Sequence, residues 1–469
     1  MSEEISKAEL LKEELFMEQK HAAAIIDEKE TEEAFDFCEG YKDFLTECKT
    51  EREVAAFAVR EAEKKGFVPF DNTKKYSTGD KVYYLNRGKA VILAVIGKKS
   101  VKEGVNIAAA HIDSPRLDLK PNPLYEDNEI ALFKTHYYGG IKKYQWVTVP
   151  LSLHGVVVKK DGTTVSVNIG EKEGEPQFVI TDLLPHLGAS QMERKPSEII
   201  KGEELNILVG SMPFKSDKGS ELVKLNIMKI LNEKYGIVER DFLTAELEAV
   251  PAAKAVDIGF DRSMIGGYGH DDRVCAYPAL QAILELDGAP ERTAVTVLTD
   301  KEETGSDGNT GLNSDYLRYF IADLGRCEGD IMGRDVLSKS KCLSADVNAA
   351  FDPTFAHVLD KMNASYINKG IVVTKYTGAR GKSGTSDANA EFVGEVARIF
   401  DSNGVVWQLG ELGKVDEGGG GTVAKYVANM NVEVVDVGVP VLSMHAPFEV
   451  VAKLDVYMAK KAFLKFFEA

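Results

Sequence analysis

The sequence predicts an α/β protein in which a β-rich segment is inserted into an α/β domain. Short apolar runs rich in β-branched residues, typical of buried strands, occur toward both ends of the chain. Between residues 122 and 248 the pattern changes to alternating strands separated by turn residues. Polar side chains follow the apolar runs on both sides of this segment, so the pieces 1–121 and 249–469 are expected to form one domain.

The first piece is predicted to begin with helices and to continue into a sheet. Residues 8–64 are rich in Glu, Lys, Ala and Leu, with apolar residues at spacings of three and four, which predicts helix. The runs 91–97 and 105–111 are predicted to be neighbouring strands. The second of them ends in His111, and Asp113 follows two residues later.

The inserted segment is predicted to be rich in β-strands. Residues 146–151, 155–158 and 164–169 have the β-branched and apolar character of strands. The last two runs are separated by a turn that contains Asp161-Gly162. A strand, Asp-Gly turn, strand pattern is a strong hairpin signal, so we expect a hairpin here.

The most informative feature of the second piece is the pair Glu302 and Glu303, which follows the apolar run 294–299. The end of a buried strand opens at the edge of a sheet, where active sites of α/β proteins usually lie. A Glu-Glu pair taken alone is more often solvated surface. Four other segments favour the functional interpretation.

Each of these segments places a residue of a type that binds metal ions next to an apolar element. One is the strand that ends in His111; the others lead to Asp271 after a glycine-rich loop, to Asp346 after a strand, and to His445 after the apolar run 434–442. Taken singly, each has a structural explanation, such as a hydrogen-bonded pair, a helix cap or a packed histidine. Together, two histidines and several carboxylates suit zinc or another divalent ion of the first transition row.

Composition excludes several other classes of protein. The chain has 469 residues, 44% of them hydrophobic. That is enough for a large core, and about 150 residues per domain suggests two or three domains, of which we expect two. The net charge of -17, without clusters of Lys or Arg, argues against a nucleic acid partner.

The cysteines and the apolar runs predict a cytoplasmic protein. The five cysteines show no Cys-x-x-Cys spacing, so we expect neither a disulfide framework nor a thiolate zinc site. Residues 1–20 lack the pattern of a signal peptide. No run approaches the ~20 apolar residues of a membrane helix, so no membrane partner is expected.

Five motifs together resemble those of a known family. They are His111-Ile112-Asp113-Ser114-Pro115, Asp271-Asp272-Arg273, Glu302-Glu303-Thr304-Gly305, Ser344-Ala345-Asp346 and Met444-His445. From about residue 80 to the C-terminus the chain resembles the aspartyl aminopeptidase family, whose members are dinuclear zinc metallopeptidases. The resemblance implies a zinc-exopeptidase-like α/β catalytic domain, 1–121 and 249–469, and a β-rich dimerisation domain at 122–248.

The ligand types indicate how such a metal centre is arranged. Asp271 can bridge two ions about 3.5 to 4 Å apart with its two carboxylate oxygens. By resemblance, His111 and Asp346 complete the shell of one ion, while Glu303 and His445 complete that of the other. The expected cofactor is therefore two divalent ions, in first place Zn²⁺, with Mn²⁺ or Co²⁺ as alternatives.

Two carboxylates are expected to assist without binding metal. Asp113 is within reach of the far ring nitrogen of His111, where it would fix the tautomer. Glu302 is the candidate general base, which takes a proton from the water or hydroxide shared by the ions and passes it to the leaving amine. The predicted reaction is hydrolysis of a peptide bond, and the family resemblance implies that it removes the N-terminal residue of peptide substrates.

The resemblance adds two residues outside the metal centre. His186, in Leu183-Leu184-Pro185-His186-Leu187, resembles a family histidine that reaches the active site of a neighbouring subunit. The resemblance therefore implies self-association as a dimer or a dodecamer. Lys375 aligns by resemblance with a family lysine that meets an acidic first side chain of the substrate, so a preference for N-terminal Asp or Glu is expected.

Two other functions remain open from the sequence. A dinuclear deacylase of N-acyl amino acids would use the same ligands, and a non-catalytic assembly protein could share the scaffold. The second is disfavoured because all the proposed metal, base and supporting residues are present. Residues 378–383 end like a nucleotide-binding P-loop, but Tyr376 stands where that motif requires glycine, so no nucleotide site is expected.

Overall fold

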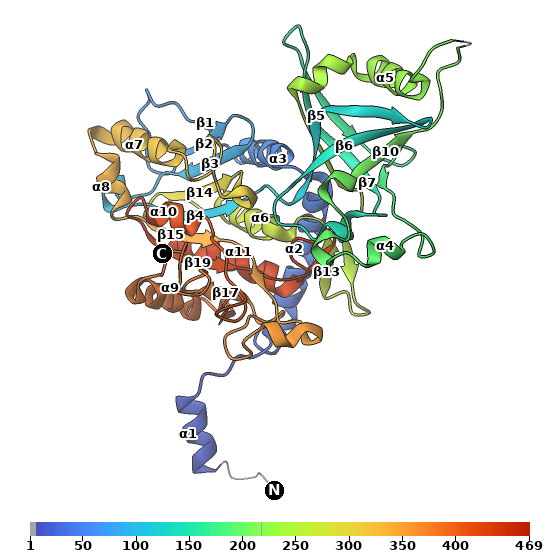
Figure 1. Ribbon diagram of the computed structural model, residues 1–469. Coiled ribbons are helices and arrows are strands. Elements are labelled where there is room, and N and C mark those ends of the chain that lie inside the picture. Colours follow the sequence, from blue (N-terminus) through green and yellow to red (C-terminus); the bar gives the residue numbers. More distant parts are fainter. Residues whose placement is uncertain (1–5, 217) are drawn as a thin grey trace.

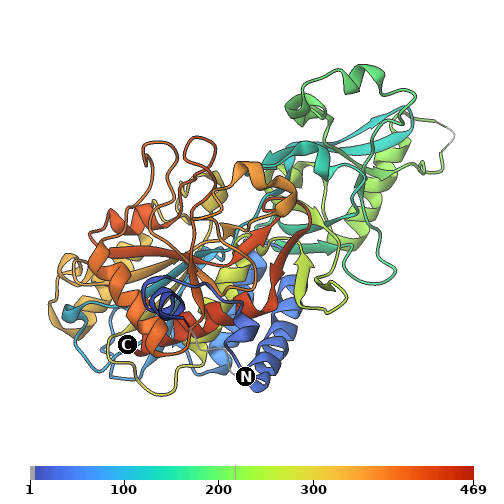
Figure 2. The ribbon, with the colours of Figure 1, turned by 90° about the horizontal axis from the view of Figure 1, so that it is seen from below.

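The structure, a computed structural model, describes residues 6–216 and 218–469. Figure 1 shows an α/β body and a smaller β-rich part that projects from it, and the turned view of Figure 2 shows the same separation. The first predicted piece, 1–121, begins with residues 1–5, which lie outside the described part.

A nine-stranded sheet forms the centre of the α/β body. Its middle strands, β14 (Ala294–Thr299), β4 (Asn106–His111), β15 (Lys341–Ala345) and β19 (Glu433–Gly438), pair in this order and run parallel. Because parallel strands end at the same edge of a sheet, the polar residues that follow them come together. The sheet continues with β3 (Ala90–Val95), β2 (Lys81–Asn86) and β1 (Val68–Pro69) on one side and with β17 (Ile371–Thr374) and β18 (Trp407–Leu409) on the other.

The two strands predicted to be neighbours, β3 and β4, are not adjacent. β14 lies between them, antiparallel to β3 and parallel to β4. All six residues of β14 are buried, and the strand exchanges backbone hydrogen bonds on both sides. β14, which comes from a distant part of the chain, therefore occupies the position next to β3 where β4 was expected.

The stretch predicted to be helical over residues 8–64 contains three α-helices, α1 (Lys7–Leu15), α2 (Glu28–Glu47) and α3 (Glu51–Lys64), and a 3₁₀ turn, η1 (Ala22–Ala24); residues 16–21 and 25–27 are not helical. Side-chain caps begin the last two, since Asp27 accepts the N–H of Glu30 and Thr50 accepts that of Glu53. α1 stands away from the body in Figure 1 and has no buried residue.

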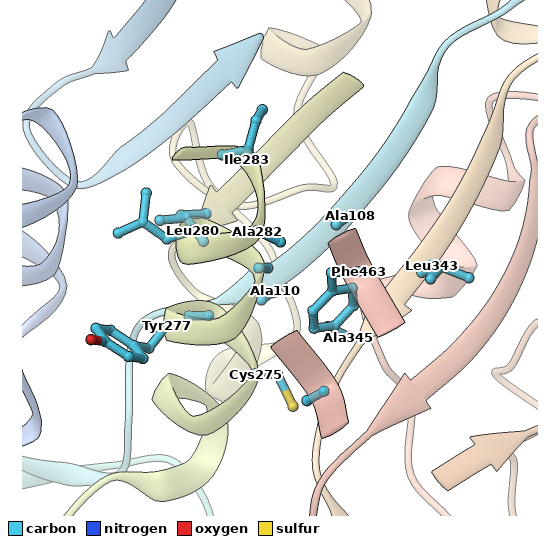
Figure 3. Packing of buried hydrophobic residues seen from close by; sticks show 14 of the residues in the cluster. Ala108, Ala110, Cys275, Tyr277, Leu280, Ala282, Ile283, Leu343, Ala345 and Phe463 are labelled. Atoms are coloured by element: carbon cyan, nitrogen blue, oxygen red, sulfur yellow. The ribbon is translucent and has the colours of Figure 1, made fainter. Parts of the chain in front are cut away.

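Helices cover both faces of the central sheet. On one face pack α2, α3, α6 (His270–Leu284), α9 (Ala390–Ser402) and α11 (Lys453–Glu468); on the other pack α7 (Tyr316–Gly329), α8 (Gly333–Leu337) and α10 (Ala424–Ala428). Side chains of β4 alternate between the two cores, with Ala108 and Ala110 in the first and Ile107 and Ala109 in the second. Figure 3 shows α6 packed over the small Ala108 and Ala110 side chains.

The projecting part contains a seven-stranded sheet in the order β8-β7-β11-β5-β6-β10-β9. The predicted hairpin is confirmed, because β7 (Leu151–Val158) and β8 (Thr164–Ile169) pair antiparallel around the Asp-Gly turn. Of the predicted strand 146–151 only Leu151 is strand, as the first residue of β7, and Trp146 closes a 3₁₀ turn, η3 (Lys143–Trp146). The remaining elements are β5 (Arg116–Asp127), β6 (Ile130–Tyr138), β9 (Val179–Ile180), β10 (Asn206–Gly210), β11 (Ala245–Pro251), α4 (Ala189–Met192) and α5 (Leu222–Tyr235).

Two strands carry the chain between the α/β body and the projecting part. The boundaries predicted at 121/122 and 248/249 fall inside β5 and β11, which pair with each other at Asp118 and Glu248. The division into domains stays a prediction.

A third sheet, of five strands, lies at the edge where the central strands end. Its strands are β12 (Val256–Ile258), β13 (Met264–Gly267), β21 (Glu449–Ala452), β20 (Pro440–Leu442) and β16 (Asn348–Ala349). The apolar run 434–442 is therefore divided between two sheets rather than forming one strand. Gly438 makes this passage possible, because a Cβ there would lie 1.6 Å from the backbone oxygen of Asp346. Among the described residues no helix is long and apolar enough to cross a membrane.

Candidate metal centre and active site

Strand ends bring four of the predicted site residues to one edge of the central sheet. His111 is the last residue of β4, and Asp346 follows β15. Glu302 and Glu303 lie in a 3₁₀ turn, η7 (Glu302–Thr304), just after β14. The parallel register places His111 opposite Thr299, the last residue of β14, so the histidine and the glutamates emerge side by side.

Asp271 lies between two histidines that come from different sheets. Its Oδ1 is 3.1 Å from His111 Nε2, and its Oδ2 is 3.0 Å from His445 Nε2. Asp271 is the second residue of α6, while His445 lies in the loop between β20 and β21. One carboxylate thus offers one oxygen toward each histidine, which is the arrangement that a ligand shared by two ions requires.

Two further carboxylates complete the set of donors. Glu303 Oε1 is 3.5 Å from His445 Nε2, and Asp346 Oδ1 is 3.7 Å from His111 Nε2. The Glu303 oxygen is buried and has no hydrogen-bond partner in the described residues. Imidazole nitrogens and carboxylate oxygens at this spacing fit divalent ions such as zinc, and a cation would satisfy the buried oxygen.

Glu302 also lies close to the donors. Its Oε2 is 3.9 Å from His111 Nε2, and donor atoms of Glu302, His111 and Asp346 all lie within 4.8 Å of one another. At this distance Glu302 could contact a metal ligand. It could equally take a proton from a nearby water.

The pKa values of the candidate metal ligands and of Glu302 show an excess of negative charge among these side chains. Burial, followed by the charge of Asp346, raises the pKa of Glu302 to about 8. Burial, with Asp271 next, holds the pKa of Glu303 well above its usual range. For His445, burial is outweighed by Asp271 and Glu303, which raise its pKa to about 10. Carboxylates that resist ionisation and a histidine that holds its proton together indicate a site built for added positive charge.

Asp113 connects the first histidine to the two glutamates. It is buried, and its Oδ1 is 3.3 Å from His111 Nδ1. Its oxygens also accept the backbone N–H groups of Glu302 and Glu303, both at 3.2 Å, and the hydroxyl of Tyr138 at 2.7 Å. The contact predicted between Asp113 and His111 is therefore present, and the same carboxylate holds the η7 turn in place.

Glu449, which the sequence interpretation missed, makes the equivalent contacts on the other side. It is the first residue of β21 and is buried. Its oxygens accept the backbone N–H groups of Asp271 at 3.2 Å and of His445 at 2.7 Å. The only sequence signal was a carboxylate four residues after His445, which has no meaning without the fold.

The donors open into a cavity of about 600 Å³. Besides the site carboxylates and His445, the glycine-rich loop 419–421, Lys425 and Tyr426 line this cavity. The side chain of Lys425 is partly buried and makes no ion pair with the described residues. The predicted substrate lysine, Lys375, is exposed and does not line the cavity.

His186 is also remote from these donors within one chain. It lies exposed in the projecting part, between β9 and α4, and does not line the cavity. The apolar side chains beside it, Leu183, Leu184 and Leu187, are 52%, 50% and 68% exposed. An exposed apolar loop of this kind is typical of a surface that another molecule covers.

Comparisons with known proteins show the family of the chain. Residues 44–467 match the model of the Peptidase M18 family, described as aminopeptidase I zinc metalloprotease. The protein named "Probable M18 family aminopeptidase 1" of Clostridium acetobutylicum is 50% identical over 459 residues, which cover 96% of this chain and 98% of that protein.

Solved structures show the same fold. The crystal structure of an M18-family aminopeptidase from Thermotoga maritima superposes with a TM-score of 0.92 at 44% identity, covering 96% of this chain and 99% of that chain. A more distant relative, the S. cerevisiae mApe1 dodecamer, shares the fold at a TM-score of 0.73 and 20% identity, with 93% of this chain and 96% of that chain covered. The chain belongs to the M18 family of aminopeptidase I zinc metalloproteases, and it is a metallo-aminopeptidase.

Proposed function

We propose that this aminopeptidase removes the N-terminal residue of peptides with the help of two divalent metal ions, with Glu302 as general base. The observation that carries the proposal is the position of Asp271, whose two oxygens lie 3.1 and 3.0 Å from the Nε2 atoms of His111 and His445. A carboxylate that points one oxygen at each of two histidines is suited to bridging a pair of ions.

The donors divide into two sets that share Asp271. His111 and Asp346 would hold one ion, and Glu303 and His445 the other. Zn²⁺ is the ion we expect, because nitrogen and oxygen donors in sets of three or four are its usual environment, with Mn²⁺ and Co²⁺ as alternatives. When bound, the ions supply Lewis-acid polarisation of the scissile carbonyl and lower the pKa of water.

The protein's own groups move the proton. Glu302 takes a proton from the attacking water as the water oxygen bonds to the carbonyl carbon. The same carboxyl group then gives the proton to the amine as the peptide C–N bond breaks. Its backbone is held by Asp113, which supports a fixed position for the base.

Substrate preference is the next part of the proposal. We propose a preference for N-terminal Asp or Glu, which the family resemblance assigns to Lys375. Lys425 is an alternative carboxylate partner, because it lines the cavity while Lys375 does not. A lysine ammonium and a substrate carboxylate form a charge-assisted pair whose strength increases as water is excluded.

Self-association is also proposed. The exposed leucines beside His186 support a subunit contact at this loop, and the histidine would then reach a neighbouring active site. We propose segment 122–248 as the dimerisation domain, and a dimer or a dodecamer as the assembly.

A cytoplasmic location is also proposed. It is consistent with the five cysteines, which are buried and free.

The function is tested with metal-reconstituted protein and a panel of aminoacyl chromogenic substrates. Cleavage of free-amine substrates but not of N-acylated ones supports an aminopeptidase. Cleavage of the N-acylated compounds would support the deacylase alternative. No cleavage of either class in protein loaded with two ions would support a non-catalytic assembly protein.

A further inference from the structure

Glu449 joins two of the proposed metal ligands through their backbones. Its side chain is 1% exposed, at the start of β21. Oε2 accepts the N–H of Asp271 at 3.2 Å, and Oε1 accepts the N–H of His445 at 2.7 Å. The two carboxylate oxygens of Glu449 thus bond the backbones of Asp271 and His445, whose side chains lie 3.0 Å apart.

Neither of these ligands is placed by regular secondary structure alone. Asp271 stands at the first turn of α6 with non-helical backbone angles, φ -78° and ψ 108°. His445 has a left-handed backbone, φ 64°, as does Ser443 at φ 59°. A left-handed backbone at a non-glycine residue such as His445 or Ser443 is strained and persists where surrounding contacts hold it.

Apart from the approach of its Nε2 to Asp271 Oδ2, the other contacts of His445 do not fix its position relative to Asp271. Its side chain is 35% exposed, and its Nδ1 lies 2.8 Å from the backbone oxygen of Gly140, which belongs to a different segment. Of the described residues, Glu449 is the one whose side chain bonds the backbones of both ligands. It therefore links the α6 turn to the β20–β21 loop.

We propose that Glu449 is a positioning residue that fixes Asp271 and His445 relative to each other and thereby sets the affinity of one of the two metal ions. The inference rests on the proposed metal centre. The ion concerned is the one held by Asp271, Glu303 and His445. The ion held through His111, Asp346 and the shared Asp271 has further support from strand ends and from Asp113, so it is expected to be less sensitive.

The chemistry of the side chain predicts graded variants. A carboxylate has two acceptor oxygens and can receive both N–H groups. Glu449→Gln keeps the shape and one acceptor, but turns an NH₂ group toward one backbone N–H. Glu449→Ala removes both contacts and frees the loop.

The chain offers a matched control in Asp455. This carboxylate is also fully buried and accepts two backbone N–H groups, those of Asn368 at 2.6 Å and Gly370 at 2.7 Å. It makes no contact with the metal donors. Asp455→Asn therefore perturbs a similar buried contact without affecting either ligand.

The test is titration of the metal-free, full-length protein with zinc by calorimetry and chelator competition. Wild type is expected to give two dissociation constants. In Glu449→Ala one of them rises about 10- to 100-fold, the usual effect of losing a group that orients a ligand, and the other changes less than about threefold. In Glu449→Gln the same dissociation constant is expected to rise by an intermediate factor, and Asp455→Asn is expected to leave both constants unchanged. If Glu449→Ala does not fold, Glu449→Gln carries the test.

Turnover gives a second readout. In the Glu449 variants kcat is expected to recover toward wild type as zinc is raised, because a weakly held ion is restored by mass action. Unchanged zinc constants in both Glu449 variants, or equal weakening of both sites, would overturn the inference. Wild type that fails to bind two ions would instead overturn the proposed metal centre itself.

Discussion

Asp113 accepts a hydrogen bond from the backbone N–H of Glu302 at 3.2 Å. The residue that supports the His111 ligand therefore also holds the candidate base. Asp113 follows β4 and Glu302 follows β14, which are neighbouring parallel strands. The contact joins the ends of these strands and couples the position of a ligand to that of the proton acceptor.

Tyr138 donates its hydroxyl to Asp113 at 2.7 Å and comes from β6 of the projecting part. Tyr138→Phe should lower kcat about tenfold, because a hydrogen bond to a charged group contributes about 1.5 to 3 kcal/mol and 1.4 kcal/mol is a factor of ten. Steady-state kinetics of the two-metal enzyme measure this. Tyr137→Phe, at an exposed neighbour on the same strand, is the control. Equal kinetics in all three proteins would mean that Asp113 does not need this donor.

Glu302→Gln removes the base while keeping the size of the side chain. We expect both metal ions to remain and turnover to fall about 10²- to 10⁴-fold, the usual contribution of a general base. Elemental analysis and kinetics on the same preparation check both parts. A variant with full activity would remove Glu302 from the mechanism.

Two lysines are compared for the preference for acidic substrates. Lys425 lines the cavity and Lys375 does not, so we expect Lys425→Ala to lower kcat/KM for N-terminal Asp and Glu about ten- to hundredfold, with little change for apolar residues. Lys375→Ala is the paired variant, and a selective loss there instead would support the family assignment. A wild type that prefers leucine would show that neither lysine forms an acidic pocket.

Subunit mixing tests His186. His186→Ala and Glu302→Gln subunits should each have low activity alone, while hybrids regain part of it, because one active site can then combine an intact histidine with an intact base. Exchange of subunits is verified by native mass spectrometry. Hybrids with no more activity than the parents would place His186 outside the neighbouring site.

His154 links the α/β body to the projecting part and predicts a pH dependence of stability. Its ring nitrogens lie 2.8 Å from Glu53 and 3.0 Å from Glu171. Burial alone would lower its pKa, but the bonds to Glu171 and Glu53 outweigh burial, and the pKa is raised. A raised pKa in the folded state means stabilisation that is complete below about pH 6.5, the ordinary value, and is lost as the pH rises through the folded value.

The measurement is the thermal midpoint of wild type and His154→Gln between pH 5.5 and pH 9, at constant metal concentration. The variant should be less stable than wild type at low pH, and the difference should shrink as the pH rises. His136→Gln, at an exposed position on β6, should follow wild type throughout. Parallel curves for wild type and His154→Gln would contradict the predicted linkage.

The strand ends of the site could be predicted from the sequence because buried strands have a local signature. The runs before His111, Glu302 and Asp346 are apolar and short, and the polar residue after each marks the edge of the sheet. Pairing order has no such signature, and for this reason β14 between β3 and β4 was missed.

Contacts made through the backbone also leave no pattern in a sequence. Glu449 acts on N–H groups of residues on two other segments, and such groups are the same in every non-proline residue. Lys425 reaches the cavity because the chain from the glycine-rich loop to α10 passes the metal donors. Both roles depend on the assembled fold rather than on local spacing.

The most direct test of the dinuclear centre is the metal content of Asp271→Ala. Asp271 is the ligand that both ions are proposed to share, so its loss should release both at once. Elemental analysis of zinc-reconstituted protein should give two ions per chain in wild type and close to none in Asp271→Ala, with the fold verified by circular dichroism. A folded Asp271→Ala protein that retains two ions would contradict the shared-ligand account.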